Sequence, residues 1–452
     1  MERHFRSTPL RMGKPKDMTR RRFLALSTAA GAMATQQPGA VAAISQDKVA
    51  GANSRICVGL IGCGRRGTAL LDVLLRLAQE GAPLEVAGVC DVFKPQLARA
   101  RALSGAAGYH RWEELVARSD VDAVLIATPT HWHAPMTLAA LDASKDVYCE
   151  RPMALNQADA LAVQQRARES GRVVQIGVER SSAGQWHRAR GVIEAGHIGA
   201  LRWIQAASKR GAAGQAPPAA ARATVSPGTL DWQNFLGAAP QRPFDPDRFL
   251  GWRKYWDYSG GPAIEDHYDA LAPILVATGV QTPRRVSSAG GIYVQDGREV
   301  PDALVTNIEY PGGHTVVLLA SPGYSRAAAP MIRGQEANIE CRGYYLQITP
   351  ESGYAERFKE RFGKENRRRM LGVRRPGHLE NWLDCIRTRE ACVCSPDLGY
   401  ATQVAVSMAA EAYREGKAIL GEAVPGEAAA HAPATGPGKP QGGRVAFAAL
   451  SG

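Results

Sequence analysis

The chain has 452 residues, of which 45% are hydrophobic and 22% charged, which is enough apolar material for two packed domains. Its formal net charge of +12 is concentrated in two clusters: residues 1–22 hold eight Lys and Arg against two acidic residues, and residues 356–375 hold nine against three. The rest of the chain is close to neutral. A leader and one solvated helix or loop face explain these clusters better than a nucleic-acid groove does, so nucleic-acid binding is disfavoured.

The N-terminal region predicts an export signal. Residues 19–24 read Thr-Arg-Arg-Arg-Phe-Leu, a modest apolar run of small residues follows, and residues 40–42 supply a small-x-small cleavage pattern. These features predict a twin-arginine signal peptide over residues 1–42 and a linker over 43–54, with a disordered basic tail as the alternative. The apolar run is too short for a permanent membrane anchor. We therefore expect the twin-arginine export machinery as a partner and a periplasmic or secreted mature protein.

Two different patterns of apolar residues follow. From residue 55 to 181, apolar strands alternate with helical stretches, which predicts a doubly wound parallel sheet of the Rossmann type. From 182 to 420, longer runs alternate apolar and polar residues without helices between them, which predicts an open, mainly antiparallel sheet. Two final helices should pack back on the core, and the Ala-, Gly- and Pro-rich residues 421–452 should be a disordered tail. The predicted fold class is α/β followed by α+β.

The eight cysteines indicate neither a disulfide framework nor a metal site. Four of them lie in or beside predicted core strands, where cysteine acts as a small apolar residue. Cys392 and Cys394 are separated by one residue, which suits neither a bridge nor metal-ligand spacing. We expect no structural metal.

A glycine motif predicts a dinucleotide site directly after the first strand and before a helix. Gly62 permits a tight turn, Gly64 lets a pyrophosphate approach the backbone, and Gly67 allows close contact between helix and strand. The N-terminus of the following helix offers free N–H groups to the phosphates. The motif contributes five predicted cofactor-binding residues: Gly62, Gly64, Arg65, Arg66 and Gly67.

Asp91 closes the second predicted strand, 24 positions beyond Gly67. A carboxylate there would accept hydrogen bonds from the adenosine ribose and repel a 2′-phosphate, which favours NAD over NADP. Lys94 and Arg65 lie nearby and reduce that preference. A cap for the next helix is the alternative role of Asp91.

Residues 121–154 show a buried strand, a turn with two histidines, a helix, a short strand and then Glu150-Arg151-Pro152. With the glycine motif, this stretch resembles the glucose–fructose oxidoreductase / inositol dehydrogenase (Gfo/Idh/MocA) family, in its exported subgroup with twin-arginine signals. The resemblance spans roughly residues 55–418 and implies an NAD-dependent enzyme acting on sugars or polyols. It also implies that six residues border the nicotinamide: Thr128, Pro129, Thr130, His131, His133 and Glu150.

The chain departs from that family where proton transfer is expected. The family uses a lysine in a Glu-Lys-Pro motif and a later Asp…His pair, whereas this chain has Arg151, which stays protonated and can orient a substrate but is a poor base. In the later segment, Glu265 stands at the usual Asp position and Asp269 at the usual His position. His267 is the best candidate base because its intrinsic pKa lies near neutrality, and Tyr268 is the runner-up.

Aromatic and polar residues elsewhere could line a polyol pocket, since sugars stack on aromatic faces: Arg180, Ser181, Trp186, His187, Trp252, Arg253, Tyr255 and Trp256. The leading interpretation is an exported NAD-dependent oxidoreductase acting on a sugar, glycoside or cyclic polyol. The alternatives are an NAD-dependent glycoside hydrolase or lyase that oxidises the sugar ring transiently, and a binding protein that has lost catalysis. The open sheet suggests a homo-oligomer by analogy, and the Ala-, Pro- and Gly-rich residues 211–228 are either a cover over a site or a surface insertion.

Overall fold

The computed structural model describes residues 55–209, 219–322, 329–363 and 366–421. The predicted signal peptide, linker and C-terminal tail lie outside this part of the chain, apart from Gly421. No helix in the described ranges is both long enough and apolar enough to cross a membrane.

The first domain contains a six-stranded sheet in the order β3-β2-β1-β4-β5-β6, with every neighbouring pair parallel. This order confirms the predicted Rossmann sheet, whose order reverses between β1 and β4. Its strands are β1 Ile56–Ile61, β2 Leu84–Cys90, β3 Ala107–Tyr109, β4 Ala123–Ile126, β5 Asp146–Glu150 and β6 Val174–Gly177. The connecting helices are α1 Arg65–Gln79, α2 Lys94–Ser104, α3 Trp112–Val116, α4 His133–Asp142 and α5 Gln157–Ser170.

The second domain contains a nine-stranded sheet in the order β14-β13-β12-β11-β7-β10-β9-β8-β15. Its neighbouring strands are antiparallel except for β7 and β10, which are parallel, so the predicted mainly antiparallel sheet is confirmed. The strands are β7 Leu201–Lys209, β8 Arg285–Gly291, β9 Ala303–Tyr310, β10 His314–Ser321, β11 Met331–Gly334, β12 Ala337–Arg342, β13 Tyr345–Pro350, β14 Arg368–Leu371 and β15 Ile419–Leu420.

The prediction that no helices lie between the strands of this domain was wrong. Ten of the thirteen residues of α11 are buried, so the helix is apolar on nearly all sides and lacks the amphipathic period that would reveal it in sequence. Three short 3₁₀ turns also occur: η1 Thr130–Trp132, η2 Glu179–Ser182 and η3 Trp252–Lys254. The additional helices are α6 Gly184–Glu194, α7 Ala219–Ala223, α8 Trp232–Leu236, α9 Pro246–Leu250, α10 Gly261–Ile264, α11 Asp266–Thr278 and α12 Ala355–Phe362.

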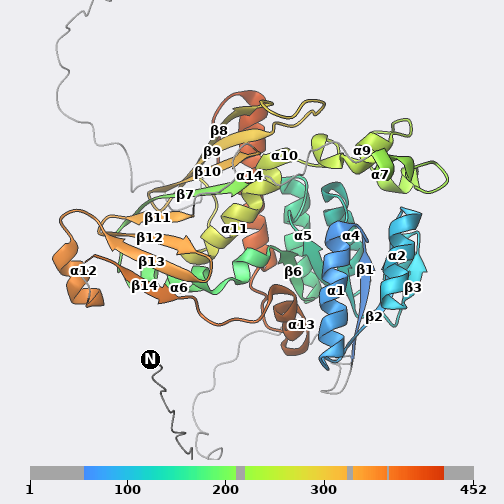
Figure 1. Cartoon of the computed structure of the whole chain (residues 1–452), viewed down its shortest axis with the longest axis horizontal. Coiled ribbons are helices and arrows are strands. Elements are labelled where there is room, and N and C mark those ends of the chain that lie inside the picture. The colour runs from blue at the N-terminus through green and yellow to red at the C-terminus, as the bar shows by residue number, and fades with distance from the viewer. Residues whose placement is uncertain (1–54, 210–218, 323–328, 364–365, 422–452) are drawn as a thin grey trace, which may run out of the picture. The chain divides into compact units, whose positions relative to one another are not determined.

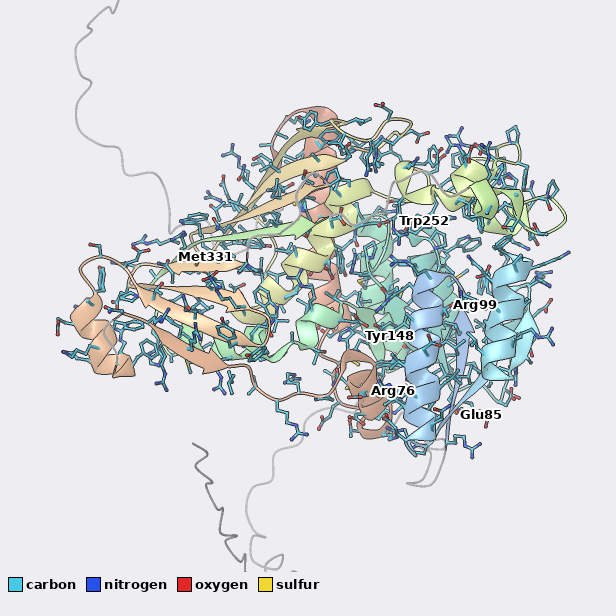
Figure 2. All side chains as sticks on the ribbon, in the orientation of Figure 1. Arg76, Glu85, Arg99, Tyr148, Trp252 and Met331 are labelled. Carbon is cyan, nitrogen blue, oxygen red and sulfur yellow. The ribbon has the colours of Figure 1, made fainter. Side chains whose placement is uncertain are left out.

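Two helices near the end of the described chain pack on the Rossmann domain, and one of them also contacts the second domain. Helix α14, Pro396–Glu415, contacts α5 of the Rossmann domain as well as α11 and β8 of the second domain (Figure 1). Helix α13, His378–Thr388, packs Trp382 edge-on against Tyr148 of β5, with 5.6 Å between the ring centroids; Tyr148 is labelled in Figure 2. The shared core holds the carboxyl ends of the parallel strands, where Rossmann folds place ligands, against α11.

Candidate functional site

Two cavities share Arg151 as a common wall. The first, of about 310 Å³, runs from the glycine loop to the turn after β4. The second, of about 520 Å³, is lined by α11, by η2 and α6, and by residues at and near the ends of β7 and β12. Arg151 follows β5 directly, so the chain places one cationic side chain between the two cavities.

The glycine loop has the geometry of a dinucleotide cradle. Gly62 has φ of +90°, and a Cβ there would lie 2.7 Å from the backbone carbon of Ala127. A Cβ on Gly67 would overlap the carbonyl oxygen of Gly62, so both positions exclude larger residues. Gly64 differs, because its Cβ would meet nothing closer than Gln96 Oε1 at 3.7 Å. The protein itself leaves room there, at the uncapped N-terminus of α1, and a pyrophosphate fits that room.

We expect Gly64→Ala to fold normally but to weaken NAD binding by at least tenfold, because the added methyl group occupies the space assigned to the pyrophosphate. Gly67→Ala should lose both binding and thermal stability, because its Cβ has no room even in the free protein. Tryptophan-fluorescence titration with NAD and thermal unfolding measure the two properties. Gly191→Ala on α6, where a Cβ meets nothing within 4 Å, is the matched control. Unchanged NAD affinity in Gly64→Ala would contradict this placement of the phosphates.

Asp91 lines the first cavity and supports the glycine loop. Its Oδ2 accepts a hydrogen bond of 2.7 Å from the Cys63 amide, and its Oδ1 accepts one of 2.7 Å from the Phe93 amide. Burial raises the pKa of this carboxyl to about 6, although both amide bonds lower it. The Phe93 contact lies within the turn and does not cap α2, which begins at Lys94 and has no side-chain cap, so the alternative capping role of Asp91 is not observed. Lys94 Nζ donates to the carbonyl of Gly228 at 2.8 Å, whereas Arg65 is exposed at the cavity wall.

The residues of the turn after β4 that were predicted to border the nicotinamide fall into two groups. Thr128, Pro129 and His133 line the first cavity, whereas Thr130 and His131 do not. The Thr130 hydroxyl donates to Glu265 Oε1 at 3.4 Å. His131 Nε2 lies 2.9 Å from the carbonyl oxygen of Phe235, and burial lowers the pKa of this histidine to about 4. These two side chains therefore attach the turn to the second domain.

His133 forms two hydrogen bonds to backbone carbonyls. Its Nδ1 lies 2.7 Å from the oxygen of Pro152, and its Nε2 lies 2.9 Å from the oxygen of Thr128. Carbonyl oxygens only accept, so both ring nitrogens must donate and the ring is an imidazolium. Burial opposes this charge, but Cys149 and the two carbonyls outweigh burial and raise the pKa to about 9. His133 thus fixes the turn after β4 against the segment after β5.

Glu150 lines the first cavity, and its carboxylate forms an ion pair with Arg66. Arg66 Nη2 lies 2.7 Å from Glu150 Oε1 and 2.8 Å from Glu179 Oε1. Burial raises the pKa of Glu150, and the Arg66 charge lowers it. Arg66 therefore positions a buried carboxylate at the nicotinamide end, and its guanidinium is already engaged by two acids.

Asp269 lies in the second cavity between two guanidinium groups. Arg151 Nε is 3.0 Å from Asp269 Oδ1, and Arg180 Nη1 is 3.4 Å from Oδ2. Trp186 lines the same cavity, but its indole nitrogen is buried. A carboxylate and two cations around one cavity can bind and orient a polyhydroxylated molecule.

Glu265 is buried and holds the two domains together. Its Oε2 accepts from Arg253 Nε at 2.7 Å, and its Oε1 accepts from Ser259 Oγ at 2.9 Å as well as from Thr130. Its backbone carbonyl accepts from Arg151 Nη1 at 2.9 Å. Glu265 lines neither cavity, so it positions Arg151 and the turn after β4.

The structure brings neither His267 nor Tyr268 to these two cavities. Both are fully buried on α11, and the Tyr268 hydroxyl donates to the carbonyl of Gly399 at 2.9 Å in the core. Burial raises the pKa of Tyr268 well above its ordinary value. Positions 265 and 269 are four residues apart and share a helix face, whereas 267 and 268 face elsewhere. We therefore replace His267 and Tyr268 as candidate bases with Asp269.

The residues expected to line one polyol pocket are distributed between several places. Arg180 and Trp186 line the second cavity, and Trp252 and Arg253 line the first. The remaining four line neither: Ser181, His187, Tyr255 and Trp256.

Several cavity residues were not anticipated from the sequence. Gln96, His110 and Trp112 lie on the first domain, far from the glycine motif in sequence, and no local pattern marks them. The others come from the turn after β4, from α4 and from the segment after β7: Trp132, Met136, Asn234, Phe235, Phe249 and Leu250. Among the described residues, no three His, Cys, Asp or Glu side chains form a group that could hold a metal ion, and all eight cysteines are free thiols.

Known sequences similar to this chain match its first domain, which carries the glycine loop of the first cavity. Residues 56–178 match the profile of the GFO_IDH_MocA family, described as an oxidoreductase family with an NAD-binding Rossmann fold. The inositol 2-dehydrogenase of Salmonella typhimurium is 34% identical over 144 residues, which is 31% of this chain and 42% of that protein. A glycosyl hydrolase family 109 protein of Stenotrophomonas maltophilia is 32% identical over 145 residues, 29% of each chain. The first domain is therefore similar to an NAD-binding oxidoreductase family, and the matched part spans less than half of either relative.

Comparison with solved structures covers both domains. The WlbA dehydrogenase from Bordetella pertussis, solved in complex with NADH and UDP-GlcNAcA, matches with a TM-score of 0.60 at 17% identity. The match covers 82% of this chain and 99% of that one. At this identity the likeness shows that the two-domain fold is shared.

Proposed function

We propose that this protein is an NAD-dependent oxidoreductase that transfers a hydride between a hydroxyl-bearing carbon of a sugar, glycoside or cyclic polyol and the nicotinamide. The arrangement of Asp269 and Arg151 at the boundary of the two cavities carries this proposal. One cavity is built on the dinucleotide loop, and the other presents a proton acceptor beside hydrogen-bond donors. The inositol dehydrogenase relative and the WlbA neighbour support a sugar or polyol substrate.

Three charged residues of the second cavity have a defined task. Asp269 accepts the proton of the substrate hydroxyl, while Arg151 and Arg180 hold its carboxylate in place and donate to neighbouring hydroxyls. The bound nicotinamide supplies the hydride acceptor. Arg151 cannot act as the base because a guanidinium keeps its proton, so the usual lysine chemistry is replaced by a carboxylate held by arginines.

We infer NAD rather than NADP as the cofactor. Asp91 lies at the adenosine end of the cavity, where a carboxylate repels a 2′-phosphate. Lys94, the nearby cation that could have attracted such a phosphate, donates to the carbonyl of Gly228. Arg65 remains exposed, so the expected preference is moderate. Relative affinities for NAD and NADP in equilibrium titrations test it, and tighter binding of NADP would overturn it.

The reaction is tested with purified protein incubated with a panel of sugars, cyclic polyols and aryl glycosides, with and without added NAD. Net formation of NADH together with an oxidised sugar supports the dehydrogenase. Release of aglycone without net NADH supports the second candidate, a redox-neutral glycoside hydrolase or lyase, which the family 109 relative favours. NAD binding without either product would show a binding protein that has lost catalysis.

We further propose that the protein is exported through the twin-arginine pathway and acts as a homo-oligomer in the periplasm or outside the cell. The arginine-rich residues 19–24 support export, and the open sheet of the second domain offers a surface for association. Cell fractionation of the full chain tests the first proposal: retention in the cytoplasm would refute it. Light scattering of the purified protein tests the second, and a monomeric mass would refute it.

A further inference from the structure

The end of helix α13 and the loop that follows it bring two of the eight free thiols together. Cys385 lies in the last turn of α13, labelled in Figure 1, and Cys392 lies in the loop before α14. Both residues are buried, with exposed fractions of 3% and 7%, and both belong to the core cluster that contains Tyr148 and Trp382. Their thiols form a hydrogen bond with each other. Neither thiol takes part in the candidate site.

Asn381, one turn before Cys385 on α13, holds both segments of this contact. Its Nδ2 donates to Cys385 Sγ at 3.5 Å, and its Oδ1 accepts a hydrogen bond of 3.0 Å from the Val393 amide. Val393 is the residue after Cys392. A single side chain therefore fixes the loop beside the helix at the level of the two thiols.

Arg389 reverses the chain between the two cysteines. Its φ is +61°, which is uncommon for a residue other than glycine, and its amide donates to the Cys385 carbonyl at 2.7 Å. Its Nη1 donates to both carboxylate oxygens of the buried Asp146, at 2.8 and 3.0 Å. The sequence did not indicate the pair, because Cys385 is on a helix and Cys392 is in a loop, and the turn at Arg389 brings them together.

Two other close pairs of cysteines do not have this arrangement. Cys63 and Cys90 adjoin the glycine loop, but Cys63 Sγ lies 3.4 Å from the carbonyl oxygen of Cys90, and the two side chains belong to different core clusters. Cys394 follows Cys392 by two residues and also belongs to the other cluster. These differences single out Cys385 as the partner of Cys392.

We propose that Cys385 and Cys392 form a disulfide when the protein meets an oxidant of the disulfide class, such as oxidised glutathione or a dithiol–disulfide exchange protein. The thiolate of one cysteine attacks the oxidant's disulfide and releases one thiol, and the second cysteine then attacks the mixed disulfide and releases the other thiol. The pair loses two protons and two electrons, and the oxidant becomes two thiols. The proposed export would bring the protein to such an oxidant.

Burial determines how fast this bond forms and breaks. It raises the pKa of both thiols, so the folded protein contains little of the reactive thiolate. Residues 387–391, between the cysteines, are exposed, so local opening of this short loop gives an oxidant access. We expect slow formation and slow reduction, which suit a stabilising bond. The pair lies near Asp146, at the start of β5, whereas Arg151 of the candidate site follows the end of that strand.

Peptide mapping of the full chain tests the pairing. The protein is purified under reducing conditions, incubated with oxidised glutathione, alkylated, and digested with trypsin without reduction. Trypsin cuts after Arg387 and Arg389, so Cys385 falls in residues 375–387, and Cys392 and Cys394 fall together in residues 390–414. A disulfide joins these two peptides with the loss of two hydrogens. The variants Cys392→Ala and Cys394→Ala identify which cysteine of the second peptide is joined.

We expect the joined peptides from the oxidised wild type and from Cys394→Ala, and their absence from Cys392→Ala and Cys385→Ala. Oxidation should raise the Tm of the wild type by about 2–5 °C, because the bond closes a loop of about eight residues in the unfolded chain. The Tm of Cys392→Ala should not respond, and NAD affinity should be equal in the oxidised and reduced wild type.

The oxidation is repeated in urea below the unfolding transition, which speeds local opening of the loop. Absence of the joined peptides from the wild type under both conditions, with each peptide recovered separately, would overturn the proposal. Joined peptides that persist in Cys392→Ala would overturn it as well, because they would show a bond to Cys394. An unchanged Tm in wild-type protein that contains the bond would overturn its stabilising role. None of these results depends on the proposed oxidoreductase activity.

Discussion

Asp269→Asn is expected to lower kcat for sugar oxidation by about 10²- to 10⁴-fold, the usual contribution of a positioned base, with little change in NAD affinity. The amide keeps the size of the carboxylate and can still contact Arg151 or Arg180, but it cannot take up the hydroxyl proton. NAD affinity should persist because Asp269 lines the second cavity and not the first. Steady-state kinetics and NAD titration of the same preparation separate the two effects.

The pH dependence distinguishes a base from a residue that merely shapes the cavity. Asp269→Glu retains an ionisable group and should recover part of kcat together with the acidic limb of the kcat/KM profile, whereas Asp269→Asn should lose that limb. Tyr268→Phe removes the hydroxyl that donates to Gly399 in the core, so it should affect stability and leave the profile unchanged. If Asp269→Asn kept its rate while a His267 or Tyr268 variant lost the acidic limb in a folded protein, the base would have to be reassigned.

The local features of the cofactor site could be predicted because they are short-range. The positive φ of Gly62 and the contact of Gly67 with the Gly62 carbonyl both lie within the six-residue motif, so the pattern identifies these two glycines without the rest of the fold. The types of the two sheets could be predicted because strand periodicity reports which faces are buried. Thr130 and His131 show the limit of this reasoning. They adjoin the predicted nicotinamide turn, but their partners, Glu265 and Phe235, are more than 100 residues away.

The choice of candidate base depended on which face of α11 meets the second cavity, and the sequence does not reveal that face. Counting from the Gly-Gly segment placed Glu265 and Asp269 at the family positions, and α11 turns Asp269 toward the second cavity and His267 and Tyr268 into the core. Intrinsic pKa values favoured histidine, but the helix face decides which group meets a substrate. Arg151 was identified as an unsuitable base from its chemistry alone, and the structure adds that it lies between Asp269 and the cofactor cavity.

Acid should unfold this protein through buried neutral histidines. Burial lowers the pKa values of His131, His314 and His378 from 6.5 to about 4 each. Between those pH values the unfolded chain binds protons that the folded chain does not, so stability falls as pH decreases from 6.5 toward 4. Each histidine then costs about 3 kcal/mol. Asp91, whose pKa is raised to about 6, opposes this trend by about 3 kcal/mol, because its folded form is protonated first.

These four shifts therefore give a net loss of about 6 kcal/mol near pH 4, comparable with the total stability of about 5–15 kcal/mol of a typical protein. Urea unfolding between pH 7.5 and 4.5, a window of ~3 units around these pKa values, measures it. His314→Phe is the matched variant, because His314 lies on the antiparallel sheet away from both cavities and its shift has burial as its sole cause. Removing it should reduce the pH slope by up to one proton, about 1.4 kcal/mol per pH unit.

We expect His133 to make the protein less stable as the pH rises into the alkaline range. Its pKa rises to about 9, so its contribution is complete below pH 6.5 and is lost as pH increases through 9. The unfolding free energy should thus be greatest near neutral pH and decline on both sides, and His133→Gln should remove the alkaline decline while His314→Phe reduces only the acidic one. Constant stability from pH 7 to 4.5 would show that the three acid-side histidines are protonated in the folded state. Protonated His131 would keep its Nε2 contact with the Phe235 carbonyl, and its second N–H, on Nδ1, would be buried without a partner among the described residues.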